Sequence, residues 1–317
     1  MKPNELNAVI LDETSFNPGD LDLSKLLSLI ENWQRYESTS KEQRLKRLQN
    51  VQIAVANKIV FDKELLSQLP DLKLILLTAT GMDNVDLEYC KANNISTYNV
   101  TDYGTASVSQ HVFSLILALT TSLNDYQTMT RNGEWSKCQH FSSLQYPIQE
   151  LAGKTLGLIG YGTLAKGVEK LALAFDMKVL IAARAGSESV PEGRMIIDEL
   201  LPQVDVLSLH CPLTPTTHKL VNRSFLEKMK PNAVLINSAR GAVIDNTELA
   251  QALRNGVIAG AGIDVLEQEP PPTDHPLLDP TIPNLILTPH IAWAAIEARQ
   301  RVVDKVAENL KHWLTLK

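Results

Sequence analysis

The chain has 317 residues, a formal net charge of −6 at pH 7, 44% hydrophobic residues and 21% charged residues. A single hydrophobic core rarely grows beyond about 250–300 residues, so we expect two domains. The composition is that of an ordinary globular protein. The negative charge and the lack of a basic stripe argue against a nucleic-acid partner.

The cysteines and the N-terminal region indicate the cellular compartment of the protein. Cys90, Cys138 and Cys211 form no CxxC pair, so the sequence predicts neither a disulfide framework nor a zinc site. An odd number of cysteines is typical of a reducing compartment. The four apolar residues 8–11 are too few for a signal-peptide core or a membrane span. We therefore expect a cytoplasmic protein with no membrane partner and, since no cluster has metal-ligand spacing, no metal.

Short apolar runs alternate with helical patterns along most of the chain. The runs lack polar alternation, which is typical of strands buried on both faces of a parallel sheet. Strands alternating with helices predict doubly wound α/β layers. The expected strands are 8–11, 53–56, 74–79, 155–159, 178–182, 206–209, 233–237 and 258–265, and the expected helices include 107–119, 164–175, 223–229, 246–255 and 294–314.

A glycine-rich turn follows the expected strand 155–159 and leads into a helical pattern. Gly160 permits a tight turn, Gly162 lets the backbone approach a pyrophosphate, and Ala165 is the small third residue that such motifs tolerate. The N-terminus of the following helix offers free N–H groups and a positive dipole end to phosphates. A tight turn without a ligand is the alternative for the motif alone. The flanking strand and helix favour a dinucleotide site.

The position of this turn predicts the domain organisation. The turn lies in the middle of the chain and follows three expected strands, which require a domain of their own. After His290 only one long helical segment remains, residues 294–314. We therefore expect residues 1–101 and 288–317 to form a substrate domain and residues 102–287 to form an inserted dinucleotide-binding domain.

Further segments carry a pattern that is known from a protein family. Together with the glycine turn, and in matching order and spacing from about residue 74 to 301, they resemble the D-isomer-specific 2-hydroxyacid dehydrogenase family. Within the family, residues 103–108 and 290–294 look most like glycerate dehydrogenase, or hydroxypyruvate reductase. The segments are 80–86 (TGMDNVD), 237–241 (NSARG), 262–270 (GIDVLEQEP) and 288–292 (TPHIA).

The resemblance implies a fold, an activity and an assembly. The fold would be α/β, with a Rossmann dinucleotide-binding domain inserted into a flavodoxin-like substrate domain, both doubly wound. The activity would be reduction of a small 2-keto acid, hydroxypyruvate or glyoxylate above others, to the D-2-hydroxy acid by hydride from NAD(P)H. The family habit implies a homodimer.

The family's catalytic set maps onto Arg240, Glu269 and His290, and the chemistry supports it. An arginine presents a rigid fork of donors that suits a carboxylate and a neighbouring ketone. The ketone oxygen gains negative charge as hydride arrives, and histidine is the side chain that exchanges protons near neutral pH. A neighbouring glutamate stabilises imidazolium. Taken alone, the three residues could be a sheet-edge cap, an exposed loop acid and a hinge histidine, respectively.

The resemblance also implies binding roles. The backbone N–H groups of Thr80 and Gly81 would join Arg240 on the substrate carboxylate, and Trp293 would wall the pocket, with core packing as the alternative. Asp264 would contact the nicotinamide carboxamide. The residues expected at the cofactor are Thr105, Gly160, Tyr161, Gly162, Thr163, Leu164, Arg184, Ser187, His210, Cys211, Pro212, Ala239 and Asp264. The histidines without a matching role, expected to be structural or superficial, are His111, His140, His218, His275 and His312.

The sequence departs from the family pattern after the second expected strand of the dinucleotide domain. An acidic residue there normally binds the ribose 2′-hydroxyl of NAD, but here Ala183 is followed by Arg184, with Ser187 close behind. We therefore expect NADP(H) to be the favoured cofactor, with NAD(H) possible.

Other functions share this scaffold. C-terminal-binding-protein corepressors resemble the family and act through protein partners, but they usually carry extra tails. Formate, phosphite and 3-phosphoglycerate dehydrogenases also share the fold, and the last commonly carries an added regulatory domain. The sequence ends just after its last expected helix, so we expect an enzyme of a small 2-keto acid.

Overall fold

The computed structural model describes residues 6–186 and 189–316. The chain divides into two compact units, which are described separately. Unit 1 comprises Met1–Gly104 and Ala294–Lys317, and unit 2 comprises Thr105–Trp293. The sequence predicted that the chain returns to the substrate domain at residue 288, but residues 288–293 belong to unit 2. The reason is a set of hydrogen bonds from this segment to the strand end at Asp264.

Unit 1 contains a parallel five-stranded sheet with the order β2-β1-β3-β4-β5, which is the flavodoxin-like order. The strands β3 and β4 are buried along their whole length. The strands are β1 (Asn7–Ile10), β2 (Asn32–Arg35), β3 (Ile53–Ala56), β4 (Leu74–Leu77) and β5 (Ser96–Tyr98), and the helices are α1 (Ser24–Leu27), α2 (Arg44–Leu48), α3 (Lys63–Leu66), α4 (Leu87–Ala92) and α11 (Ile296–Thr315).

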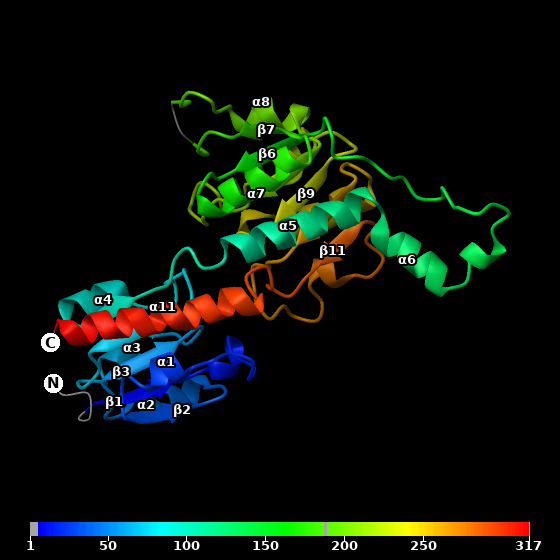
Figure 1. Cartoon of the computed structure of the whole chain (residues 1–317). Coiled ribbons are helices and arrows are strands. Elements are labelled where there is room, and N and C mark those ends of the chain that lie inside the picture. The colour runs from blue at the N-terminus through cyan, green and yellow to red at the C-terminus, as the bar shows by residue number, and fades with distance from the viewer. Residues whose placement is uncertain (1–5, 187–188, 317) are drawn as a thin grey trace. The chain divides into compact units, whose positions relative to one another are not determined.

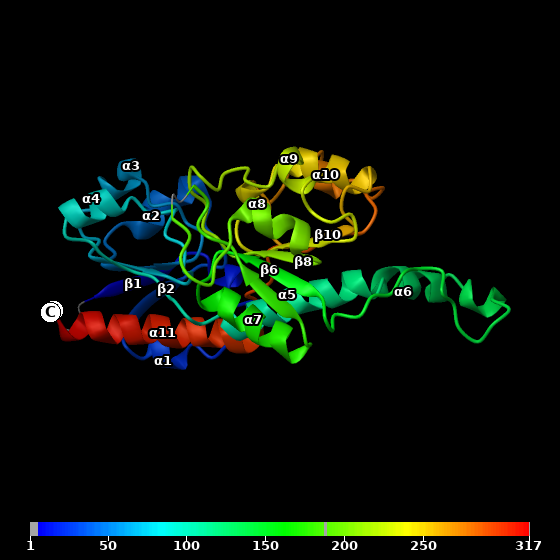
Figure 2. The ribbon, with the colours of Figure 1, turned by 90° about the horizontal axis from the view of Figure 1, so that it is seen from above.

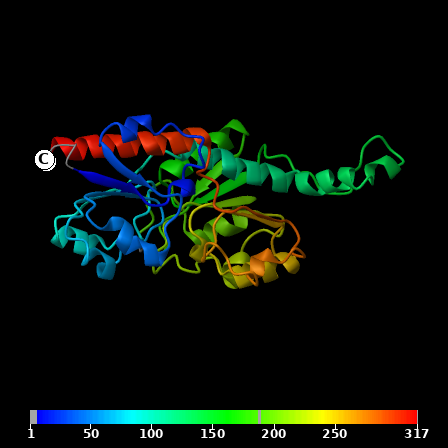
Figure 3. The same ribbon diagram turned by 90° about the horizontal axis from the view of Figure 1, so that it is seen from below.

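The last helix, α11, completes unit 1. It packs beside α1 on one face of the sheet, while α2, α3 and α4 lie on the other face (Figures 2 and 3). Val302, Val306 and Leu310 recur every four residues and are buried, which gives the helix its apolar stripe. The guanidinium of Arg299 also pairs with Asp20 at 2.6 Å. These contacts fix the returning chain to the N-terminal segment.

Unit 2 contains a parallel six-stranded sheet with the order β11-β10-β9-β8-β6-β7. An isolated parallel bridge between Ala182 and Met195 adds a vestigial strand outside β7. With this bridge the order is that of the Rossmann fold with one further strand. The strands are β6 (Thr155–Ile159), β7 (Lys178–Ile181), β8 (Val206–Leu209), β9 (Val234–Asn237), β10 (Gly260–Ile263) and β11 (Leu285–Leu287), and the helices are α5 (Thr105–Thr120), α6 (Leu123–Arg131), α7 (Thr163–Ala174), α8 (Ile197–Leu200), α9 (Arg223–Leu226) and α10 (Asn246–Arg254).

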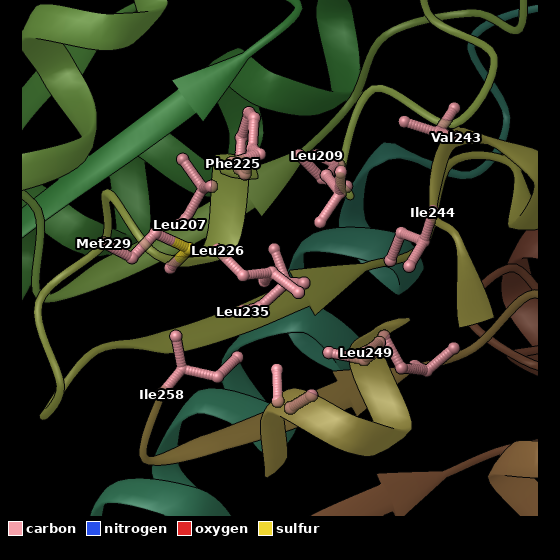
Figure 4. Packing of buried hydrophobic residues seen from close by; sticks show 14 of the residues in the cluster. Leu207, Leu209, Phe225, Leu226, Met229, Leu235, Val243, Ile244, Leu249 and Ile258 are labelled. Atoms are coloured by element: carbon pink, nitrogen blue, oxygen red, sulfur yellow. The ribbon is translucent and has the colours of Figure 1, made fainter. Parts of the chain in front are cut away.

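Helices cover both faces of this second sheet. Helices α5 and α7 pack together on one face, and α8, α9 and α10 lie on the other (Figure 2). Figure 4 shows the core under the second group, where Leu207 and Leu235 of the sheet meet Phe225 and Leu249 of the helices. Truncating such a buried leucine to alanine costs about 2–5 kcal/mol. The core therefore holds the strand ends, from which the candidate site is built, in fixed positions.

Residues 121–150 form an arm that leaves the body of unit 2 and returns to it (Figure 1). The base of the arm is closed by hydrogen bonds from Gln149 N–H to the Thr120 carbonyl and from Tyr126 Oη to the Tyr146 carbonyl. Among the described residues, no single helix is long and apolar enough to cross a membrane. Helices α5 and α6 together have the length and composition of a span, but they bend by 63°.

Candidate active site

His290 and Glu269 form a hydrogen-bonded pair in unit 2. Nδ1 of His290 lies 2.6 Å from Oε2 of Glu269, although the residues are 21 positions apart in the chain. The side chains are 31% and 35% exposed, respectively. The second oxygen of Glu269, Oε1, accepts the backbone N–H of Leu266 at 2.9 Å. The carboxylate is thus oriented by its own loop and holds the imidazole by Nδ1, which leaves Nε2 available for a reacting group.

The loop that carries Arg240 packs directly against the loop that carries Glu269. A Cβ atom on Gly241 would lie 1.9 Å from the Leu266 carbonyl carbon and 2.3 Å from the Glu267 nitrogen. Only glycine permits this approach. Gly241 therefore allows the two loops to touch, and the segments that carry the three predicted catalytic residues lie in one region of unit 2.

Arg240 sits on a loop with a fixed backbone and an exposed side chain. Asn237, at the buried end of β9, donates from Nδ2 to the Arg240 carbonyl and accepts the Ala239 N–H at Oδ1, both at 3.0 Å. The guanidinium donates from Nη1 to the Ala239 carbonyl at 2.7 Å. This is a bond within the loop, so most of the guanidinium donors remain for a carboxylate or ketone.

Asp264 is the buried centre of the same region. Its Oδ1 accepts the Thr288 hydroxyl at 2.6 Å and the Ile291 N–H at 2.9 Å, and its Oδ2 accepts the Ala292 N–H at 2.9 Å. Burial opposes ionisation, yet these bonds and that from His111 together hold the pKa of the carboxyl below its usual range. Both oxygens are engaged within the protein, so the structure gives Asp264 a structural role. The expected contact with a nicotinamide carboxamide stays a prediction.

The glycine turn fits a dinucleotide. Gly160 has a φ of +86° and lies at the end of β6, where the strand order reverses between β6 and β8. This reversal is the place where ligands bind in open α/β sheets. A Cβ atom on Gly162 would meet nothing within 4 Å, so open space lies over the turn at the N-terminus of α7. The hydroxyl of Ser238, beside Arg240, is buried without a partner among the residues described, as a group awaiting a ligand would be.

The expected adenosine side lies at the end of β8. A Cβ atom on Gly160 would lie 2.5 Å from both the His210 carbonyl carbon and the Cys211 nitrogen, so the two strand ends touch. Nε2 of His210 lies 2.9 Å from Oγ of Ser208. Burial lowers the pKa of His210 to about 4 and raises that of the Cys211 thiol. His210 is therefore neutral at pH 7.

Two arginines flank the end of β7. Ala183, at the position of the usual ribose-binding acid, is buried and donates its N–H to the Met195 carbonyl at 2.7 Å. Arg184 follows it and is exposed. Arg194 precedes Met195, and its guanidinium lies 5.7 Å from the ring centre of Tyr161 in the glycine turn. Neither arginine forms an ion pair with a carboxylate that the structure describes. Ser187 lies outside the described residues.

The other predicted site residues are distributed over both units. In unit 1, Thr80 and Gly81 follow β4, and Oγ1 of Thr80 donates to the Val100 carbonyl at 2.8 Å. In unit 2, Nε1 of Trp293 donates to the His290 carbonyl at 3.0 Å. The remaining cofactor candidates lie at the ends of α5, α7, β8 and β9, and they are Thr105, Thr163, Leu164, Pro212 and Ala239.

Sequence reasoning assigned no site role to two residues that lie at this site. His111, expected to be structural or superficial, lies in α5 beside Asp264, and Arg194 lies beside the glycine turn. No local motif marks either of them. Each reaches the site through a strand or helix that is distant in sequence.

An α/β unit with a dinucleotide-type glycine turn and an exposed His–Glu pair defines a nicotinamide-dependent dehydrogenase. A model of the D-isomer specific 2-hydroxyacid dehydrogenase NAD binding domain matches residues 113–292, which all lie in unit 2. The chain belongs to this family. It is an enzyme of the D-2-hydroxyacid dehydrogenase class with a nicotinamide dinucleotide cofactor.

Individual relatives support this assignment. A putative 2-hydroxyacid dehydrogenase of Haemophilus influenzae is 42% identical, with 98% of both chains covered. Glycerate dehydrogenase of Methylorubrum extorquens is 44% identical over 88% of each chain. Among solved structures, an acyclic imino acid reductase in complex with NADPH and D-Arg superposes with a TM-score of 0.85 at 29% identity and covers 98% of both chains.

Proposed function

We propose that the protein reduces a small 2-keto acid, hydroxypyruvate or glyoxylate, to the D-2-hydroxy acid with hydride from a nicotinamide cofactor. The observation that carries this proposal is the 2.6 Å hydrogen bond between His290 and Glu269, whose loop packs against the Arg240 loop. The likeness to glycerate dehydrogenase, whose oxidation product would be hydroxypyruvate, favours that substrate.

Each of the three side chains has a distinct role in this proposal. The guanidinium of Arg240 binds the carboxylate and polarises the ketone with paired donors. Glu269 accepts the Nδ1 proton of His290, so that Nε2 is the position which gives its proton to the ketone oxygen. In the oxidation direction the neutral Nε2 takes the proton back. When bound, the nicotinamide would supply or accept the hydride, and the Gly160–Gly162 turn and the N-terminus of α7 would hold the pyrophosphate of the cofactor.

The substrate test is a spectrophotometric panel. Purified protein is given hydroxypyruvate, glyoxylate and pyruvate, each with NADPH and with NADH, and the chirality of the product is determined. The proposal expects the first or second acid to give the highest kcat/KM and a D product. No turnover of any of the three acids would contradict it and would favour the protein-binding alternative of the corepressor type.

We further propose that the enzyme prefers NADPH. An acid at position 183 would repel a 2′-phosphate, and Ala183 removes that repulsion. Arg184 and Arg194 supply positive charge on the two segments that meet at the end of β7. A hydrogen bond to a charged group contributes about 1.5–3 kcal/mol, which is about 10–150-fold in affinity. The solved neighbour with bound NADPH supports the proposal by likeness only.

The cofactor test compares kcat/KM for NADPH and NADH in the wild type, Arg184→Ala and Arg194→Ala. The proposal expects a wild-type preference for NADPH. Each substitution should lower the NADPH value about tenfold or more and leave the NADH value within a few-fold. Arg223→Ala, an exposed arginine of the same unit paired with Glu227, is the matched control. An equal loss with both cofactors, or a wild-type preference for NADH, would contradict the proposal.

We also propose that the chain forms a homodimer through the arm of residues 121–150. The arm exposes apolar side chains that have no core to join, including Phe141 at 92% and Leu144 at 88% exposure. Clusters of this kind mark interfaces in stable proteins. Light scattering after size exclusion should give a dimer for the wild type and a monomer for Phe141→Asp/Leu144→Asp. Leu173→Asp, at an exposed leucine of α7, should stay dimeric. A monomeric wild type would contradict the proposal.

A further inference from the structure

His111 lies in the middle of α5 and points to the segment that carries His290. Its side chain is 15% exposed. Nε2 lies 3.1 Å from Oγ1 of Thr288 and 3.4 Å from Oδ1 of Asp264. Thr288 is 177 positions away in the chain. A helix on one face of the sheet thus contacts, through one nitrogen, the part-buried hydroxyl that follows β11 and the buried carboxylate that follows β10.

The direction of these hydrogen bonds follows from the donors that are present. The Thr288 hydroxyl has one proton, and at 2.6 Å from Oδ1 of Asp264 it donates that proton to the carboxylate. The same hydroxyl can only accept from His111, so Nε2 of His111 carries a proton. His111 therefore completes a chain in which N–H donates to hydroxyl and hydroxyl donates to carboxylate. Such chains strengthen each bond in a desolvated site.

This carboxylate fixes the backbone on both sides of His290. Thr288 precedes His290 by two positions, and the N–H groups of Ile291 and Ala292, which follow it, bind the Asp264 carboxylate. The N–H of His290 itself donates to the Asp264 carbonyl at 2.8 Å. The main chain of His290 is thus surrounded by bonds that depend on one buried aspartate.

His290 needs this support because its backbone is strained. Its φ is +55°, in the left-handed region that residues with a Cβ atom rarely adopt. Such a conformation costs about 1–3 kcal/mol and persists only where the surroundings impose it. It is also the conformation that brings Nδ1 to within 2.6 Å of Glu269. If the strain were released, the imidazole would lose its hydrogen bond to Glu269 and its orientation.

We propose that His111 is a positioning residue for the proton-donating histidine. Acting through Thr288 and Asp264, it keeps the His290 backbone in its strained conformation. The inference rests on the proposed role of His290 in keto-acid reduction. His111 touches neither substrate nor cofactor in this account. Its removal should therefore lower kcat and leave the KM for the cofactor almost unchanged.

The experiment is a double-mutant cycle on kcat with hydroxypyruvate, or the best acid of the panel. His111→Leu removes the bond to Thr288, and Thr288→Val removes that bond together with the one to Asp264, so each should lower kcat roughly tenfold or more. The double variant should be no slower than the slower single variant, because both changes break the same chain. His111→Gln, whose amide can donate from nearly the same position, should recover most of the rate. Gln110→Leu, an exposed neighbour on α5, is the matched control.

Other outcomes would overturn the inference. Losses that multiply in the double variant, or a His111→Gln variant as slow as His111→Leu, would show that His111 acts by bulk alone. A wild-type kcat in His111→Leu would show that it has no role. If His111→Leu does not fold, Thr288→Val and His111→Gln still test the inference. A slow Thr288→Val variant beside a fast His111→Gln variant would support the positioning role, and the reverse result would contradict it. A wild type that reduces no keto acid would contradict the proposed function instead, so the two failures are distinct.

Discussion

Two of the acid–histidine pairs of unit 2 lie at the candidate site, and they are made of the same chemical groups but differ in burial. His290 and Glu269 are about one-third exposed and lie 2.6 Å apart. His111 is 15% exposed and lies 3.4 Å from Asp264, whose side chain has no exposed surface. In the exposed pair, Nε2 of His290 is available to a ligand, because only Nδ1 is bonded to Glu269. The nitrogen of the buried pair that faces the site is engaged by a hydroxyl and a carboxylate.

The difference indicates that burial, more than residue type, assigns the role. An exposed imidazole can exchange a proton with a ligand, and its acid partner stabilises the charged form. A buried carboxylate surrounded by donors is expensive to disturb, because each freed donor would be left without water. The buried pair therefore suits holding the backbone, and the exposed pair suits the chemistry.

The largest effect is expected at the exposed pair. His290→Ala should lower kcat for keto-acid reduction about 10²–10⁴-fold, the usual contribution of a positioned proton donor. The Kd for NADPH, measured by fluorescence titration, should change little, because no backbone group of the glycine turn is altered. His218→Ala, at an exposed histidine, serves as the control. A variant that reduces hydroxypyruvate near the wild-type rate would remove His290 from the proton transfer.

A third histidine sharpens the comparison, because His210 is desolvated without an acid partner. Its pKa falls from 6.5 to about 4. Between these pH values the unfolded chain binds a proton that the folded chain does not, so the free energy of unfolding should fall as the pH drops from 6.5 to 4. The loss attributable to His210 should reach about 3 kcal/mol near pH 4. Above pH 6.5 the residue should contribute nothing to the pH dependence.

The measurement is urea unfolding of the wild type and His210→Asn at several pH values from 4 to 7. The variant should show a shallower decline over this range, whereas His218→Asn should follow the wild type. Parallel curves for the wild type and His210→Asn would mean that His210 is not desolvated.

Substitutions of Arg240 test whether its exposed guanidinium binds the substrate carboxylate. Arg240→Lys should raise the KM for the keto acid about tenfold, because an ammonium cannot reproduce the paired bonds of the fork. Arg240→Ala should raise KM and lower kcat together. Steady-state kinetics at saturating cofactor measure both. An unchanged KM for the keto acid in both variants would refute the role.

The smallest change is expected for the partner of His290. Glu269→Gln removes a charge that favours imidazolium. Reduction needs a protonated His290, so the variant should lose activity at a lower pH than the wild type as the pH rises. A displacement of the profile to lower pH is the expected effect. Profiles of kcat/KM from pH 5 to 9 reveal it, and coincident profiles would place Glu269 outside the proton transfer.

Some elements could be predicted from sequence because they satisfy local rules. The buried strands β3, β4, β6 and β8 were found since uninterrupted apolar runs are typical of parallel sheets. Strand β2, with the sequence NWQR, was missed because an exposed edge strand needs no apolar pattern. The three-residue strands β5 and β11 are too short to show one. Helix α6 was not predicted because it lies in the arm and not over a core, so its sequence lacks a strong apolar stripe.

The candidate site divides in the same way. The pairing of Glu269 with His290 was predicted because each belongs to a segment with a recognisable pattern, and so does Arg240, whose loop packs against that of Glu269. The positions of His111 beside Asp264 and of Arg194 beside the glycine turn were not predicted, because they depend on contacts between segments that are distant in sequence. The end of the dinucleotide unit was also misplaced, because hydrogen bonds to Asp264, and not the sequence pattern, attach residues 288–293 to unit 2.

The central claim is that the exposed pair transfers the proton and the buried pair positions it. The most direct test is the pH profile of kcat/KM for keto-acid reduction, from pH 5 to 9, in the wild type, His290→Ala and His111→Leu. We predict that the wild type loses activity as the pH rises. His111→Leu should follow the same curve at reduced height, and His290→Ala should be slow and independent of pH over this range. A flat profile in His111→Leu, or a preserved decline in His290→Ala, would contradict the assignment of proton transfer to the exposed pair.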